Sequence, residues 1–100
     1  MRGLEKKKLL HESEIIELSS EEAFLKYKSV LYNYCKKYNN LNTDLEERFQ
    51  IASLGFMKAF NNYNNLKVPF IAYLQLILNN EFLMEFRKKK NREKFNAKQY

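Results

Sequence analysis

Residues 44–64, DLEERFQIASLGFMKAFNNYN, are the stretch of sequence that decides the fold. Placed on a helix, the apolar side chains recur at intervals of three and four, which is typical of a helix that packs on a core. The resulting stripe consists of Leu45, Phe49, Ala52, Phe56, Ala59, Phe60 and Tyr63. Thr43 followed by Glu46 predicts a capping box at the helix start. A glycine inside a helix costs about 1 kcal/mol relative to alanine, so at Gly55 we expect another backbone segment to cross close by.

Two further helices are predicted, one on each side of this stretch. Ser19 and Glu22 form a second capping-box pattern, which predicts a helix that runs to about Tyr38. Its apolar face consists of Phe24, Tyr27, Leu31, Tyr34, Cys35 and Tyr38. Pro69 lies where a helix accepts proline, in its first turn, and predicts one long helix to about Lys90. The side chains of this helix that can face the core are Phe70, Leu74, Ile77, Leu78 and Phe82.

The composition predicts a single all-α domain, a compact bundle of three to four helices. The chain has 100 residues, 45% of them hydrophobic, with two glycines and one proline, which leaves little material for the turns of an all-β protein. We divide it into a basic and polar lead over residues 1–18 that has room for a short helix, a helical domain over 19–92, and a basic tail over 93–100. No apolar run approaches the roughly 20 residues of a membrane span. The single cysteine fits a reducing cytosol, so we expect a cytoplasmic protein.

The net charge of +6 is unevenly distributed along the chain. Residues 1–50 carry equal numbers of basic and acidic side chains, so the whole excess lies in residues 51–100. Most of the basic side chains of that half are gathered between Arg87 and Lys98. A run of cations at one end of a helix favours a polyanionic partner there, although such runs are usually solvated faces.

The sequence lacks the patterns that carry enzymatic chemistry. It has no glycine-rich phosphate loop, no cluster of metal ligands and no plausible nucleophile–base set, so we expect neither an enzyme nor a cofactor or metal. His11 has no partner residues for catalysis or metal binding, which favours a surface or packing role. Cys35 lies on the predicted core face, which favours a small core residue over a reactive thiol.

Three segments in the same order resemble region 2 of bacterial RNA polymerase sigma factors, over roughly residues 20–92. The central helix is similar to a family pattern of the form D-L-x-Q-E-G-x-x-G-L-x-x-A-x-x-x-Y/F-D. The positions that match it are Glu47, Gln50, Gly55, Phe56, Met57, Ala59, Tyr63 and Asn64. SSEEAFLKYKSVLYNYCKKY resembles the preceding family helix, and VPFIAYLQLILNNEFLMEFRKKK resembles F-x-x-Y-x-x-x-x-I-R-N/Q.

The resemblance implies that the central helix docks on a coiled coil of the polymerase clamp. By position, the residues that would face this partner are Glu47, Gln50, Ser53 and Met57. The sequence departs from the family at Ile51, where a glutamate is usual, and at Ala52, where a glycine is usual. Ile51 and Leu54 lie off the core stripe, so we expect an exposed apolar patch that would suit a partner helix. The alternative is that the polar residues are only solvated.

The resemblance also implies that the long helix after Pro69 binds the minus-ten promoter element. The DNA-binding residues that it implies are Phe70, Tyr73, Leu76, Asn79, Asn80, Arg87, Lys88, Lys89, Lys90 and Arg92. Tyr73 would stack on an unpaired base, Asn80 would bond a base edge, and the cations would bind phosphates. Leu76 and Ile77 replace an aromatic pair of the family, and leucine cannot stack on a base. For Tyr73, an ordinary core tyrosine is the alternative.

The sequence therefore favours a transcription-initiation module that binds RNA polymerase core and promoter DNA. No recognisable helix-turn-helix for the minus-35 element is present, so the chain is either a fragment of a longer sigma factor or a split factor whose partner chain supplies it. A co-regulator that occupies the clamp without binding DNA is the alternative from another class. A plain basic helical DNA-binding protein of a mobile element is the third hypothesis.

Overall fold

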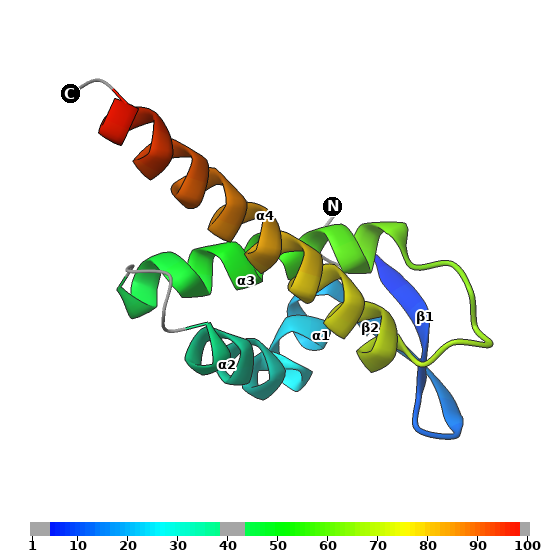
Figure 1. The fold of residues 1–100 in the computed structure, drawn as a ribbon. Coiled ribbons are helices and arrows are strands. Elements are labelled where there is room, and N and C mark those ends of the chain that lie inside the picture. The colour runs from blue at the N-terminus through cyan, green and yellow to red at the C-terminus, as the bar shows by residue number, and fades with distance from the viewer. Residues whose placement is uncertain (1–4, 39–43, 99–100) are drawn as a thin grey trace.

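The computed structural model describes residues 5–38 and 44–98, with side chains described as far as Lys88. In this part of the chain a β-hairpin precedes four helices (Figure 1). The elements are β1 (Lys6–His11), β2 (Glu14–Ser19), α1 (Ser20–Lys26), α2 (Lys28–Lys37), α3 (Leu45–Asn62) and α4 (Phe70–Lys98). The predicted all-α bundle of three to four helices is confirmed as the fold class, and the hairpin is an addition to it.

The core forms where α3 packs against α2 on one side and α4 on the other. Ala52, Phe56 and Ala59 of α3 are fully buried, as the predicted stripe requires. Leu45 is the exception, because it lies in the first turn of α3 and stays 48% exposed. The predicted core faces of the other helices are likewise buried, with Phe24, Tyr38 and Ile77 at their margins. A fully buried Cys35 is a core residue, and burial raises the pKa of its thiol.

Gly55 is the point where α4 crosses α3. A Cβ atom at this position would lie 2.9 Å from Leu78 Cδ2 and 3.3 Å from Glu81 Cγ, both on α4. The predicted close crossing is therefore confirmed, with side chains of α4 rather than its backbone as the nearest atoms. Glu81 is held at this crossing by an ion pair with Lys58 of α3.

Two helix N-caps were predicted from the sequence. The cap of α1 is the predicted one, whereas the cap of α3 is a different residue. Ser19 and Glu22 form the predicted capping box, with the Ser19 hydroxyl accepting from the Glu22 amide at 3.2 Å. The hydrogen bond from the Ser19 backbone to the Glu22 carboxylate lowers the pKa of that group. The N-cap of α3 is Asp44, whose carboxylate accepts from the Glu47 amide at 2.8 Å. The predicted cap Thr43 lies outside the described residues.

The helix predicted from Ser19 to Tyr38 is divided in two at Tyr27. This residue ends α1 and begins α2 with φ −103° and ψ 12°, outside the helical range. The Tyr27 ring is nearly fully buried and lies 5.1 Å from the Phe70 ring, centroid to centroid. Nδ1 of His11 lies 2.9 Å from the Tyr27 hydroxyl, which gives His11 the packing role that its isolation predicted.

Residues 6–19 form an antiparallel hairpin, so the short helix predicted within residues 1–18 is wrong. Leu9 pairs with Ile16 and is fully buried in the core, which leaves this segment neither frayed nor loosely packed. Its side chains alternate between the two faces, and the neighbouring isoleucines of β2 favour a strand. The turn places Glu12 at φ 56°, a left-handed conformation that a non-glycine residue seldom adopts.

The long helix α4 extends well past the other elements. The molecule measures 56 × 26 × 23 Å, and the C-terminal half of α4 projects from the bundle (Figure 1). The helix continues through residues 93–98, across the boundary predicted for the basic tail. Among the described helices, none combines the length and the hydropathy needed to cross a membrane.

Candidate functional site

The outward face of α3 carries a mixed polar and apolar surface. Glu47, Gln50 and Met57 are exposed on it, as predicted, and Met57 has 40% of its surface accessible. Ser53 is half-buried at the flank of this face. Leu54, which was not among the residues implied to face the partner, is 63% exposed and lies between Gln50 and Met57 on this face. We call Glu47, Gln50, Leu54 and Met57 the α3 face.

The predicted apolar patch beside Gln50 is present in part. Leu54 is exposed, but Ile51 is half-buried and packs against the core. Ile51 and Leu54 line a groove of about 140 Å³ between α3 and α4, which also includes Met84 and the Lys58–Glu81 ion pair. The apolar surface of α3 therefore continues onto α4 rather than remaining a separate patch.

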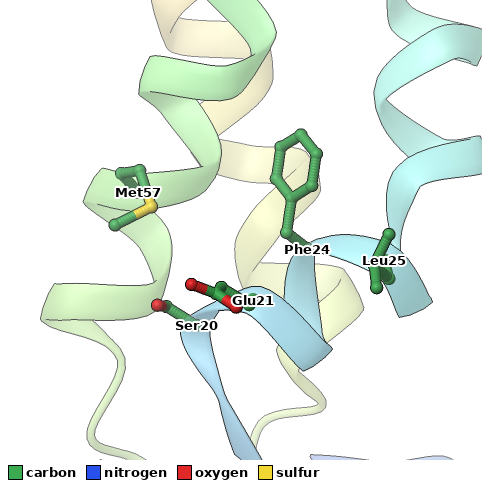
Figure 2. A pocket seen from close by; sticks show the side chains of 5 residues that line it. All are labelled: Ser20, Glu21, Phe24, Leu25 and Met57. Atoms are coloured by element: carbon green, nitrogen blue, oxygen red, sulfur yellow. The ribbon is translucent and has the colours of Figure 1, made fainter. Parts of the chain in front are cut away.

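A second hollow joins the α3 face to α1. This pocket of about 370 Å³ is lined by Met57 of α3 and by Ser20, Glu21, Phe24 and Leu25 (Figure 2). Met57 and Phe24 flank it from different helices, while Ser20 and Glu21 form its polar edge (Figure 2). Leu25 is 70% exposed. Sequence inspection did not single out Leu25, although its place on the polar side of an amphipathic helix was a usable signal.

The outward face of α4 carries a different chemistry. Leu76, Asn80, Leu83 and Arg87 recur at intervals of three and four and are all exposed. Tyr73 continues this face toward the start of the helix and is half-buried. Lys88 is exposed beside Arg87, with its ammonium 3.7 Å from the Glu85 carboxylate. Lys89, Lys90 and Arg92 lie on the same helix, beyond the last described side chain.

Comparison with known proteins identifies the family. A family model for sigma-70 region 2 matches residues 23–92. The chain belongs to the sigma-70 region 2 family. Neither a search of curated proteins nor a search of solved structures returned a significant match.

At the level of the family, sigma-70 region 2 is a non-enzymatic DNA-binding domain. It is the part of a sigma factor that binds RNA polymerase core and recognises and melts the minus-ten promoter element. The match covers α2, α3 and most of α1 and α4, so both exposed faces lie inside it. The hairpin over residues 6–19 precedes it.

Two residues of the predicted DNA set, Phe70 and Asn79, make contacts within the fold. Phe70 is fully buried, and its ring meets those of Tyr27, Phe56, Phe60 and Tyr63 at centroid distances of 5.1–6.4 Å. Phe70 therefore cannot reach DNA while the core stays packed, and its prediction as a DNA contact is wrong. Asn79 is half-buried, and its side-chain oxygen accepts a hydrogen bond from the Tyr38 hydroxyl at 3.0 Å. Asn79 thus joins α4 to the end of α2.

Tyr73 borders a pocket that the sequence did not predict. The pocket has a volume of about 170 Å³ and is lined by Asn62, Tyr63, Asn64, Asn65, Val68 and Tyr73. It combines the end of α3, the connection over residues 63–69 and the first turn of α4. The ring of Tyr73 lies 5.9 Å from that of Tyr63, so one aromatic wall adjoins a group of side-chain amides. The asparagines on both sides of Tyr63 were the available signal in the sequence. We call this hollow the Tyr73 pocket.

The described side chains form no candidate metal site. Within residues 5–38 and 44–88, no group of three or more His, Cys, Asp or Glu side chains gathers to hold a metal ion. The candidate site of this sigma-70 region 2 domain therefore consists of the α3 face and the outward face of α4.

Proposed function

We propose that the chain is a transcription-initiation module that binds RNA polymerase core through the α3 face and minus-ten promoter DNA through α4. The observation that supports this most is the presence of two exposed faces of different chemistry on consecutive helices of one region 2 domain. Glu47 and Gln50 stand beside exposed Leu54 and Met57 on α3. A mixed surface of this kind suits a partner helix, whose apolar side chains would bury Leu54 and whose polar groups would bond Gln50.

Three features of α4 support DNA binding. Arg87 and Lys88 are exposed on a projecting helix, where their charges can neutralise phosphates. Asn80 is exposed and carries an amide that can bond adenine through two atoms. The Tyr73 pocket offers an aromatic wall to a base that has left the stack. The basic residues at positions 89, 90 and 92 would extend the phosphate contacts along the helix.

The chain acts in the cytoplasm, either as part of a longer sigma factor or as a split factor with a partner chain that reads the minus-35 element. In both forms region 2 supplies the contacts to polymerase and to the minus-ten element.

A co-regulator that occupies the clamp without binding DNA is the second candidate. Its support is the stacking surface of α4, which is smaller than the family pattern implies. Phe70 is buried, and Leu76 and Ile77 stand where the family has an aromatic pair. Tyr73 is the remaining aromatic residue of the predicted DNA set that has access to solvent.

Co-purification with polymerase tests the α3 face. Leu54→Arg places a charge at the centre of the proposed interface and should abolish co-purification with RNA polymerase core at moderate salt. Ile15→Arg is the matched control, because Ile15 is 56% exposed on β2, far from α3 in sequence and outside the matched region. Equal recovery of polymerase with both variants would refute the α3 face as the polymerase-binding surface.

Binding to single-stranded DNA separates the two candidates. Tyr73→Ala should reduce affinity for a single-stranded minus-ten oligonucleotide by about 1–3 kcal/mol, the usual contribution of one stacked base. Duplex affinity should remain nearly unchanged, and Tyr73→Phe should bind the single strand like the parent. Tyr32→Ala, at an exposed tyrosine of α2, is the control. Equal losses on duplex and single strand would favour the co-regulator.

A further inference from the structure

The hairpin is attached to the end of α3 by a half-buried lysine. Lys7 of β1 is half-buried and points inward, where its ammonium donates to the carbonyls of Phe60 and Asn61, the latter at 3.2 Å. These carbonyls belong to the last turn of α3, and that turn has no basic residue of its own. A cation at a helix C-terminus stabilises the unpaired carbonyls there. Lys7 therefore supplies, from 53 residues away, the cation that α3 lacks. Burial lowers the pKa of this ammonium.

A second attachment links the hairpin to the connection between α3 and α4. The backbone amide of Leu10 donates to the Tyr63 hydroxyl at 3.2 Å, and the same hydroxyl donates to the Val68 carbonyl at 2.6 Å. Tyr63 is almost fully buried, and both bonds are partly buried. One hydroxyl thus ties the edge of β1 to both ends of the connection over residues 63–69.

Both attachments lead to the walls of the Tyr73 pocket. Tyr63, Val68 and Asn62 line the pocket directly. Asn62 follows Asn61, whose carbonyl accepts a hydrogen bond from Lys7. Figure 1 shows β1 next to the end of α3 and the connection that follows it. The hairpin itself precedes the matched residues 23–92, so the sequence supplies this support from outside the region 2 match.

We propose that the hairpin sets the shape of the Tyr73 pocket, with Lys7 and Tyr63 as positioning residues for an unpaired base. The inference rests on the proposed function, because it takes the pocket to be the place where a base stacks. The hairpin holds the connection over 63–69 in the conformation that keeps the pocket open before DNA arrives. A binding site that is ordered beforehand loses less conformational freedom on binding, so its affinity is higher.

The test compares two neighbouring lysines that point to opposite faces of β1. Lys7→Met removes the cation at the end of α3, whereas Lys8→Met removes the same charge from an exposed position paired across the hairpin with Glu17. Lys7→Arg keeps the cation. Tyr63→Phe keeps the ring and removes the bridging hydroxyl. Hydrogen exchange of the amides in residues 61–68 is measured on each full-length variant, together with the ratio of single-strand to duplex affinity for a minus-ten oligonucleotide.

We expect Lys7→Met and Tyr63→Phe each to accelerate exchange in residues 61–68, and to lower the affinity ratio, by about two- to fivefold. Lys7→Arg and Lys8→Met should both leave the exchange rate and the affinity ratio near the parent values. Exchange in residues 61–68 that stays unchanged in Lys7→Met would overturn the proposal, and so would an increase of the same size in α2. If exchange changes as expected but Tyr73→Ala has no effect on single-strand binding, the assignment of the pocket to a base fails while the hairpin's support of the connection stands.

Discussion

The two halves of α4 differ in burial and in charge. In the first half, over residues 70–82, Phe70, Leu74, Leu78 and Phe82 are fully buried against the rest of the bundle. In the second half, none of the described residues 83–88 is buried, and the helix projects from the bundle (Figure 1). The first half takes its position from packing, and the second half carries all of the basic residues of α4. One continuous helix therefore joins a rigid support to a charged surface.

This difference predicts which substitutions will change stability and which will change the binding of a polyanion. A substitution in the packed half leaves a cavity or a clash that the bundle cannot relieve. A substitution of a charged residue in the projecting half changes the electrostatic potential that attracts a polyanion. It leaves the free energy of unfolding nearly unchanged. The experiments below test this distinction, from the largest expected effect on stability to the smallest.

Phe70→Ala should have the largest effect, a loss of about 3–5 kcal/mol in the free energy of unfolding. The reason is that the Phe70 ring is fully buried among four other aromatic rings. Urea unfolding followed by circular dichroism measures it, with Arg87→Ala as the control in the other half. A Phe70→Ala variant of parental stability that has lost DNA binding would reverse the assignment of Phe70 to the core.

Gly55→Leu should come next, with a loss of about 1–3 kcal/mol from overpacking. Any Cβ at this position already meets Leu78 Cδ2 at 2.9 Å, so a larger side chain must displace the side chains of Leu78 and Glu81 or move α4 itself. Asn61→Leu is the control, because Asn61 is exposed on the same helix. Thermal unfolding of both variants gives the comparison, and a melting temperature of Gly55→Leu at or above the parent's would contradict the close crossing.

Glu81→Gln and Glu85→Gln form a matched pair at the boundary between the halves. Glu81 is nearly buried and paired with Lys58, so we expect its substitution to cost about 1 kcal/mol after allowance for the exposed lysine. Glu85 is paired with the exposed Lys88, and its substitution should change stability by less than about 0.5 kcal/mol. Equal effects in urea unfolding would show that the boundary lies elsewhere.

Arg87→Ala combined with Lys88→Ala should have the smallest effect on stability, within about 0.5 kcal/mol. The double variant should instead make the dependence of duplex affinity on salt shallower, by about one to two units of the log–log slope. Fluorescence anisotropy with two unrelated duplexes would show equal losses on both. Lys26→Ala with Lys36→Ala removes the same charge from exposed positions of α1 and α2. A slope that changes as much in this control would remove the special role of α4.

The sequence predicted those parts of the fold whose apolar residues follow a regular spacing over many residues. The apolar stripe of α3 and the core side of α4 each extend over several turns, and a period of 3.6 is reliable over that length. Gly55 was informative because a glycine in an otherwise continuous stripe needs a packing reason. The Ser19–Glu22 box was predicted because both halves of its reciprocal bonding are local in sequence.

Features that depend on distant contacts were missed or misplaced. The hairpin has strands of six residues, too few for alternation to outweigh a helical pattern, and its inward face includes Lys7, whose partners lie on α3. The Tyr73 pocket needs three segments to meet, which no spacing in the sequence reveals. Phe70 lay on the predicted core side of its helix and also matched a DNA position of the family. The buried rings around it decide between the two assignments.

The contact between Lys7 and the end of α3 also bears on the order in which the protein folds. Closing a loop of about 50 residues costs roughly 3.5 kcal/mol of chain entropy, far more than one hydrogen bond returns. During synthesis β1 leaves the ribosome before the residues of α3 on which it docks. The contact between them therefore forms only after those residues have been synthesised. The hairpin and α1 can fold from local contacts. However, β1 can pack on α3 only after the C-terminal end of α3 has emerged from the ribosome. The first strand in the sequence is therefore among the last elements to reach its final place.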